Sequence, residues 1–219
     1  MEMEITMKKC ALHSLGCKVN SYETQAMQKM MESAGYEIVP FGEEIADIYI
    51  INTCSVTNIA DRKSRQMIHK AKKLNPEAVV AAAGCYVESA GDNIDEDVDI
   101  VIGNNEKSHL IEILNEYFEH MDKEKSVDIG KATDFDELNI DSPLEHTRAY
   151  VKIQDGCNRF CSYCIIPYVR GRIRSRKPDD VMAEIKRVAA SGCKEVVLTG
   201  IHLSSYGLDF KDSTVKLID

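Results

Sequence analysis

The sequence predicts an α/β fold, with a parallel sheet covered by helices in the amino-terminal part and a second, smaller strand–helix unit after it. Segments typical of strands and of helices alternate through residues 1–121. The strand segments are mainly apolar instead of alternating, which is typical of parallel strands buried on both faces. The chain has 219 residues, of which 44% are hydrophobic, so it is long and apolar enough for one large domain or two small ones.

The elements of the first domain, residues 1–121, follow from the apolar pattern. Short apolar runs predict strands at 9–14, 47–52, 78–83 and 98–102. Apolar residues at helical spacing predict helices at 22–34, 59–74 and 110–121. The second of these helices stops at Asn75, because the following Pro76 disfavours helical geometry in the residue before it.

A linker and a second unit are expected after the first domain. Residues 122–146 contain many acidic residues and no sustained apolar period, which indicates a linker between domains. Residues 147–219 form the second unit. Its expected elements are, in order, a strand at 148–154, a cysteine-rich loop, a helix between Pro178 and Gly192, a strand at 196–199 and the beginning of a helix at 213–219.

Charge is distributed unevenly along the chain, whose formal net charge is −9. From Arg148 to Lys177, eight basic residues and one acidic residue give a local charge of +7. This segment predicts either a surface that binds a polyanion such as RNA or an ordinary solvated basic face. The same two alternatives apply to the helix that carries Arg62, Lys63, Arg65, Lys70, Lys72 and Lys73.

The sequence favours a cytoplasmic protein without a membrane segment. No run approaches the roughly 18 apolar residues that indicate a membrane span, and the residues after Met1 are too polar for a signal peptide. In a reducing compartment, the eight cysteines favour metal binding or catalysis over disulfide formation. Cys10 and Cys193 lie outside two groups of three cysteines and are interpreted as small buried apolar residues.

Three cysteines lie close together in one loop. Cys157, Cys161 and Cys164 have the spacing C-x3-C-x2-C. Three thiolates can hold three corners of a cubane iron–sulfur cluster and leave its fourth iron open to a substrate or cofactor. A structural zinc site is the alternative, but no histidine lies between His146 and His202, so zinc would need a distant fourth ligand.

The other three cysteines each follow a predicted strand. Cys17 follows the strand at 9–14, Cys54 the strand at 47–52 and Cys85 the strand at 78–83. Parallel sheets place ligands at the carboxyl ends of their strands, so the three thiolates are expected to converge at one edge. This pattern favours a second cluster held by three cysteines. The alternative, three core cysteines, would place them within the strands.

Four motifs together resemble the radical S-adenosylmethionine (SAM) methylthiotransferase family. They are Leu15–Asn20 with Glu23, Asn52–Thr57, Gly84-Cys85 and the loop Cys157–Cys164, and the resemblance extends from Cys10 to Asp209. The segment Cys17-Lys18-Val19-Asn20 is similar to the branch that acts on N6-threonylcarbamoyladenosine in tRNA. The isopentenyladenosine branch and the ribosomal-protein branch typically carry Cys-Gln-Met-Asn and Cys-Pro-Lys-Asn there.

The resemblance implies two [4Fe-4S] clusters and SAM as cofactors. Cys157, Cys161 and Cys164 would hold the cluster that binds SAM, whereas Cys17, Cys54 and Cys85 would hold an auxiliary cluster that carries the sulfur to be inserted. Tyr163 would line the adenine site. Arg170 and Arg172 would contact either SAM or tRNA phosphates. No catalytic side chain beyond the cluster ligands is expected, because radical chemistry belongs to the cofactors.

The activity implied by the resemblance is methylthiolation of N6-threonylcarbamoyladenosine at position 37, in the anticodon loop of tRNA, to its 2-methylthio derivative. An electron donor such as flavodoxin or ferredoxin would be needed. The second unit would supply the first strand–helix units of a radical SAM (β/α) barrel, which requires further units. We therefore expect a chain of this length to be an incomplete enzyme without turnover of its own.

Three other functions remain open from the sequence. One is methylthiolation of isopentenyladenosine 37, the activity of the sister branch. Another is a zinc-dependent RNA-binding module without catalysis. A simple electron carrier is the third, although a carrier gains nothing from two clusters that each leave an iron open.

Overall fold

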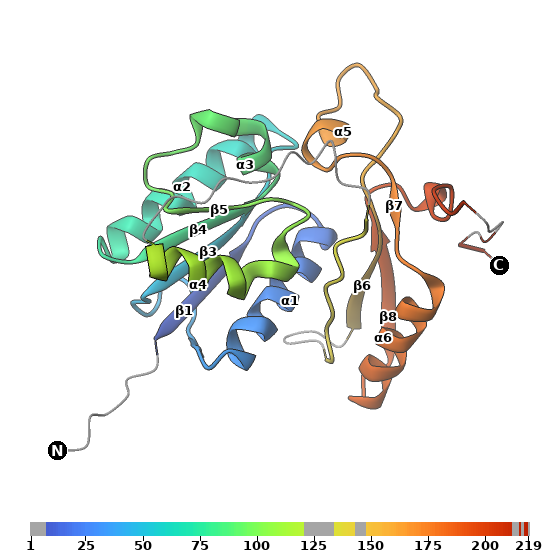
Figure 1. Cartoon of the computed structure of the whole chain (residues 1–219), viewed down its shortest axis with the longest axis horizontal. Helices are drawn as coiled ribbons and strands as arrows, with labels where there is room; N and C mark the ends of the chain where they lie inside the picture. Colours follow the sequence, from blue (N-terminus) through green and yellow to red (C-terminus); the bar gives the residue numbers. More distant parts are fainter. Residues whose placement is uncertain (1–7, 121–133, 143–147, 212–214, 216, 219) are drawn as a thin grey trace.

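Two sheets organise the chain, and helix α1 (Lys18–Ser33) lies between them (Figure 1). The computed structural model describes residues 8–120, 134–142, 148–211, 215 and 217–218. The first sheet has the strand order β2-β1-β3-β4-β5 and the second the order β7-β6-β8. Within the described residues, we find no helix with the length and apolar character needed to cross a membrane.

The first sheet is parallel throughout, which confirms the predicted fold class. Its strands are β1 (Lys9–Ser14), β2 (Glu37–Ile38), β3 (Ile48–Thr53), β4 (Val79–Gly84) and β5 (Ile100–Ile102). The chain passes from β1 outward to β2 and then crosses to β3 on the other side of β1. The strand order therefore reverses between β1 and β3, and ligands bind at the carboxyl ends of the strands beside such a reversal.

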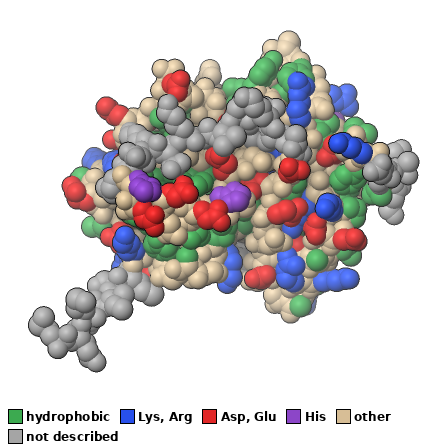
Figure 2. All heavy atoms as spheres, in the orientation of Figure 1, with side chains coloured by type: hydrophobic (Ala, Val, Ile, Leu, Met, Phe, Trp, Pro, Cys, Tyr) green, Lys and Arg blue, Asp and Glu red, His purple; other side chains and the backbone are tan. Residues whose placement is uncertain are grey.

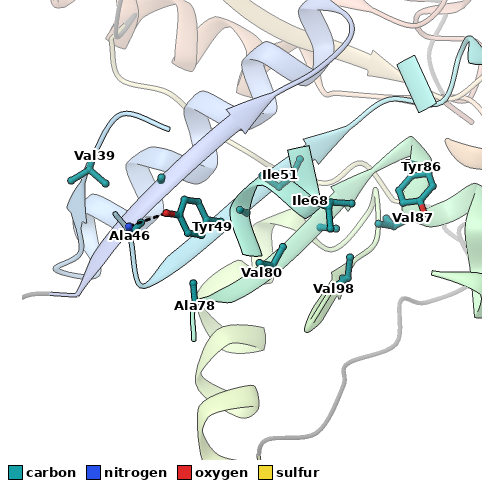
Figure 3. Packing of buried hydrophobic residues seen from close by; sticks show 13 residues of the cluster. Val39, Ala46, Tyr49, Ile51, Ile68, Ala78, Val80, Tyr86, Val87 and Val98 are labelled. Carbon is teal, nitrogen blue, oxygen red and sulfur yellow. Dashed lines mark hydrogen bonds between the residues drawn. The ribbon is translucent and has the colours of Figure 1, made fainter. Parts of the chain in front are cut away.

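Helices cover both faces of this sheet. Alternate residues of β3 point to opposite sides, so Tyr49 and Ile51 pack with Ile68 of α2 (Asn58–Leu74). Figure 3 shows this cluster, in which the Tyr49 hydroxyl accepts a hydrogen bond from the Ala46 amide at 3.1 Å. Ile48 and Ile50 face the other side, among residues of α1 and of α4 (Leu110–His120). A short helix, α3 (Cys85–Ala90), follows β4 directly.

The second sheet is centred on β6 (Arg148–Asp155). This strand pairs in parallel with β8 (Glu195–Gly200) and antiparallel with β7 (Arg174–Ser175). Helix α6 (Pro178–Ala190) packs on it through an apolar cluster of Val151, Ile153 and Val181. The sequence pattern indicates β6, α6 and β8 but neither β7 nor the single turn α5 (Ile166–Val169). The predicted helical turn at 213–219 lies largely outside the described residues.

Part of the predicted linker packs between the two units. In the described stretch 134–142, Leu138 and Ile140 are buried. They form an apolar cluster with Tyr22 and Ala26 of α1 on one side and with Ala149 and Val188 of the second unit on the other. The rest of residues 122–146 lies outside the described residues. In addition to connecting the domains in sequence, this stretch therefore fills the space between α1 and the second sheet.

Candidate functional site

Three cysteines lie at the carboxyl ends of neighbouring strands in the first sheet. Cys17 directly precedes α1, Cys54 directly follows β3, and Cys85 is the first residue of α3. The first two loops touch, because a Cβ at Gly16 would lie 2.9 Å from both Cβ and Sγ of Cys54. Gly16 also has a φ of 103°, a conformation that favours glycine. The small residue in this motif therefore allows the loops that carry Cys17 and Cys54 to approach each other.

Side chains of the two first motifs link the strand ends. The Asn20 amide Nδ2 donates hydrogen bonds to the carbonyl oxygens of Leu15 and Thr53, at 2.7 and 2.8 Å. Asn52 Nδ2 donates to the Asn20 carbonyl at 3.1 Å. Asn20, Asn52 and Thr53 are buried, so these hydrogen bonds fix the loops after β1 and β3 relative to each other.

Burial and charge act in opposite directions on Cys85. All eight cysteines are free thiols; Cys54 and Cys85 are buried, and Cys17 is exposed. Burial raises the pKa of the Cys85 thiol, and the charges of Arg170 and Lys107 oppose that rise. The Asn104 amide Nδ2 lies 4.0 Å from Cys85 Sγ. Polar donors that point toward a buried thiol are typical of a site that holds a thiolate-ligated group.

The second cysteine triplet lies in the loop after β6. Cys157 is buried, Cys161 is exposed and Cys164 is partly exposed. The Cys157 amide donates a hydrogen bond to the Gly171 carbonyl at 3.0 Å, and Cys157 Sγ accepts one from the Arg159 amide at 3.5 Å. The beginning of the loop is thus anchored to the chain segment that follows α5.

In neither triplet do the three sulfur atoms lie close enough together to hold a single ion. Among the described residues, only His69, Asp95 and Asp97 bring three possible ligand atoms within 4.8 Å of one another. A tetrahedral zinc ion with Zn–S bonds of about 2.3 Å would hold its sulfur ligands about 3.8 Å apart. An iron–sulfur cube places its thiolates on separate irons, and soft thiolates are its usual ligands. Neither triplet brings all three of its Sγ atoms within 4.8 Å of one another, so neither is arranged for a single zinc ion. By donor type, both suit a cubane.

The three other predicted site residues lie in very different environments. Tyr163 is 90% exposed. Arg172 is exposed, and its guanidinium lies 4.4 Å from the ring centroid of Phe160, which meets the Tyr168 ring edge-on at 5.6 Å. Arg170 is completely buried, so its guanidinium does not reach the surface that a tRNA phosphate would approach.

The segment with a local charge of +7 does not form one basic surface. Four of its eight basic side chains are buried in ion pairs with acidic groups, namely Lys152, Arg170, Arg174 and Arg176. Figure 2 shows basic and acidic side chains interspersed on the face in view. The other four basic residues of the segment are exposed, namely Arg148, Arg159, Arg172 and Lys177. Only these four can therefore contribute to either predicted surface, the polyanion site or the solvated basic face.

On the helix α2, which offers the other basic face, two of the basic residues pair with acids. Arg65 lies 3.3 Å from Asp61, and Lys72 lies 2.7 Å from Asp99. Arg62, Lys63 and Lys73 are exposed.

Three buried polar residues near the cysteines were not singled out by the sequence. Asn104 donates to the Val169 carbonyl at 2.6 Å, Lys107 lies 2.6 Å from Glu23, and Asp155 lies 3.0 Å from Arg170. Asp155 stands two residues before Cys157, which is the one signal that could have drawn attention to it. Asn104 follows β5, Lys107 begins a short 3₁₀ helix, and neither residue belongs to a sequence motif.

Two family models match the chain. Residues 9–103 match "Uncharacterized protein family UPF0004", and residues 151–217 match "Radical SAM superfamily". The first match covers Cys17, Cys54 and Cys85 and also includes Cys10. The second covers Cys157, Cys161 and Cys164 and also includes Cys193.

Curated relatives match over nearly the whole chain. The threonylcarbamoyladenosine tRNA methylthiotransferase MtaB of Bacillus subtilis is 44% identical over 209 residues, which are 94% of this chain and 46% of the relative. The protein of the same name from Aquifex aeolicus is 44% identical and covers 92% of this chain and 50% of its own length. A tRNA-2-methylthio-N(6)-dimethylallyladenosine synthase of Bacillus thuringiensis is 34% identical over 98% of this chain and 43% of its own length. The chain thus spans about half the length of the relatives it matches.

Solved structures share the fold. The radical SAM methyltransferase TsrM of Kitasatospora setae, solved with tryptophan and a SAM analogue, superposes with a TM-score of 0.56 at 12% identity over 90% of this chain and 48% of TsrM. A second structure of TsrM, with cobalamin and a [4Fe-4S] cluster bound, gives the same TM-score at 13% identity over 93% of this chain and 49% of TsrM. At this level of identity the likeness concerns the fold alone.

Proposed function

We propose that this chain, which carries a UPF0004 domain followed by a radical SAM domain and resembles tRNA methylthiotransferases over nearly its whole length, acts in the methylthiolation of tRNA. The observation that carries the proposal is the pair of cysteine triplets. One lies at the carboxyl ends of β1, β3 and β4, and the other follows β6. Each is one thiolate short of the four that close a cubane, so each leaves an iron open for chemistry.

The side chains of this chain have defined roles in the proposed reaction. Cys157, Cys161 and Cys164 would ligate the cluster that binds SAM. Cys17, Cys54 and Cys85 would ligate the auxiliary cluster. When bound, these groups would supply one-electron cleavage of the SAM sulfonium and the sulfur that is inserted. The protein contributes ligation, burial of Cys54, Cys85 and Cys157, and N–H groups directed at sulfur, such as the Arg159 amide at Cys157.

The proposed substrate is N6-threonylcarbamoyladenosine at position 37 of tRNA. Its C2 edge is accessible in a single-stranded loop, where bases can unstack and pack on aromatic rings and guanidinium groups. The exposed group of Phe160, Tyr168 and Arg172 next to the second triplet supplies such surfaces. We propose Tyr163 as the residue that lines the adenine site of SAM.

The identity of the relatives favours threonylcarbamoyladenosine over isopentenyladenosine. Relatives named for the first substrate reach 44% identity, and those named for the second are 34% identical. We further propose a cytoplasmic enzyme that receives electrons from a donor such as flavodoxin or ferredoxin, because reductive cleavage of SAM consumes an external electron.

Metal analysis tests the two-cluster assignment. After anaerobic reconstitution with iron and sulfide, the chain is expected to hold about eight irons and about eight acid-labile sulfides. Replacing all three cysteines of either triplet with alanine should lower both values to about four. Cys193→Ala is the matched control and should retain about eight of each. A chain that instead binds about one zinc ion would support the RNA-binding module and contradict the enzyme.

Nucleoside mass spectrometry tests the substrate. In cells that lack the gene, we expect the threonylcarbamoyl nucleoside to persist without its 2-methylthio product, because the proposed methylthiolation step is missing. Restoring the gene should restore the product. Loss of methylthio-isopentenyladenosine instead would assign the protein to the sister branch.

A further inference from the structure

A single buried guanidinium joins the chain segments that carry the two cysteine triplets. Arg170 Nη1 lies 2.9 Å from Glu23 Oε1 and 3.0 Å from Asp155 Oδ2. Its Nη2 donates a hydrogen bond to Asn20 Oδ1 at 2.6 Å. Arg170 and Glu23 are completely buried, and Asp155 and Asn20 are 1% exposed. Charge-assisted hydrogen bonds of this kind are strong and fix orientation as well as distance.

The partners of Arg170 are directly connected to the cysteines. Asn20 and Glu23 lie in the first two turns of α1, which begins immediately after Cys17. Asp155 ends β6, two residues before Cys157. Arg170 itself follows α5, the turn that succeeds the Cys157–Cys164 loop. A displacement of the Arg170 side chain would therefore change the position of one triplet relative to the other.

Several buried charges surround Arg170. Glu23 pairs with Lys107 at 2.6 Å and Lys152 at 2.8 Å in addition to Arg170. Asp155 pairs with Lys152 at 2.8 Å and lies 3.9 Å from Arg174. Among the described residues the set contains four basic side chains, and the acidic side chains that face it include Glu23, Asp155 and Asp136, the last through its charge interaction with Lys152.

One further carboxylate approaches this set. Burial raises the pKa of Glu88 to about 7, so this group is only partly ionised at neutral pH. Arg170 also lies close to the first triplet, because its Nη2 and the Cys17 thiol both donate to Asn20 Oδ1, at 2.6 and 3.9 Å. Its charge acts on Cys85 as well.

We propose that Arg170 is a positioning residue: it locks the two cysteine triplets at a fixed separation, and its charge stabilises the anionic, thiolate-ligated group at Cys17, Cys54 and Cys85. The nature of that group rests on the proposed function. The lock between α1 and β6 does not, because it consists of contacts among side chains of the chain itself.

The reduction potential of the auxiliary cluster tests the charge. The chain with Cys157, Cys161 and Cys164 replaced by alanine is reconstituted with iron and sulfide, so that one cluster is titrated with dithionite and followed by electron paramagnetic resonance. Arg170→Met removes a positive charge and should lower the equilibrium constant for one-electron reduction about tenfold, which is 59 mV. Glu23→Gln removes a negative charge and should raise it by a similar factor.

Two variants control for a purely structural effect. Arg170→Lys keeps the charge, so its equilibrium constant for reduction should stay within about threefold of the parent's. This variant can still be titrated if Arg170→Met fails to bind iron. Arg176→Met removes another buried arginine, one that pairs with Glu184 and Glu137 instead of Glu23 and Asp155, and should leave the potential unchanged. Shifts of Arg170→Met and Glu23→Gln in the same direction, or no shift in either, would overturn the role of the charge.

Hydrogen exchange in the metal-free chain tests the lock. Arg170→Met and Arg170→Lys should both accelerate amide exchange at 18–25 and 153–157, since neither retains the fork of hydrogen bonds to Asn20 and Asp155. Arg176→Met should accelerate exchange at 137–141 and 180–188 instead. Unchanged exchange at 18–25 in both Arg170 variants would overturn the lock. Absence of iron at Cys17, Cys54 and Cys85 in the parent would overturn the proposed function. Hydrogen exchange in the metal-free chain would then still decide whether Arg170 locks α1 to β6.

Discussion

Replacing Glu23 with alanine is expected to lower the free energy of unfolding by about 3–5 kcal/mol, because it leaves buried cations without their counter-charge. Glu23 is completely buried and pairs with Lys107, Lys152 and Arg170 at 2.6–2.9 Å. Burial raises the pKa of Glu23, but the charges of these three residues outweigh that effect and hold the pKa well below its usual range. The carboxylate is therefore ionised in the folded state at neutral pH.

The depressed pKa also sets the direction of the pH dependence. A carboxylate with a lower pKa in the folded state contributes stability that is present above its ordinary pKa of 4.5 and is lost as the pH falls toward the folded value. The parent chain should thus lose stability below about pH 4.5, and Glu23→Ala should lose less over the same interval because that contribution is already gone.

Urea unfolding at neutral and acidic pH measures both effects. Glu32→Ala is the matched control, since Glu32 lies on the same helix and pairs with Lys29 at 3.7 Å on the surface. Such exposed pairs contribute at most about 1 kcal/mol. If Glu23→Ala costs no more than Glu32→Ala, the ion pairs around Glu23 do not stabilise the fold as described.

The parallel sheet could be predicted from the sequence because its strands are buried on both faces and are therefore mainly apolar. Residues 48–51 and 78–83 are continuously apolar, and the structure places β3 and β4 one residue later than the predicted strands at 47–52 and 78–83. The position of cysteines after these strands can be predicted for the same reason, since it depends only on where a strand ends. The edge strands β2 and β7 could not be predicted, because they have two residues each, too few to show any period.

The buried charges could not be predicted from the sequence. In β6, Ala149, Val151 and Ile153 alternate with polar residues, a pattern typical of a strand with one solvated face. In the structure the polar face is also covered, and Lys152 lies against Glu23 of α1. Lysine and arginine are rarely fully buried, so only the tertiary structure shows that a neighbouring domain supplies their partners.

The apolar residues of the predicted linker were obscured for a related reason. Leu138 and Ile140 stand among the nine acidic residues found between Glu119 and Glu145, so the composition of the segment is that of a solvated connection. Their burial depends on α1 and α6 meeting at that point. Two apolar residues without a longer period do not reveal such a contact.

Replacing Gly156 with alanine is expected to destabilise the second unit by about 2–5 kcal/mol, from backbone strain and overpacking together. Gly156 has a φ of 68°, and a Cβ there would lie 1.8 Å from the Arg172 carbonyl oxygen and 2.5 Å from its carbon. These are backbone atoms, so a side-chain rotation cannot relieve the clash. The hydrogen bond from the Cys157 amide to the Gly171 carbonyl, at 3.0 Å, would be broken as the segments separate.

The same substitution should therefore remove iron from one triplet and not from the other. After reconstitution, Gly156→Ala should retain about four irons, at Cys17, Cys54 and Cys85. Gly192→Ala is the matched control in the same unit: its φ is 94°, but nothing lies within 4 Å of the added Cβ. It should cost only about 1–2 kcal/mol of backbone strain and keep about eight irons. Equal costs in urea unfolding, or equal iron contents, would show that the contact between Gly156 and Arg172 does not hold Cys157 in place.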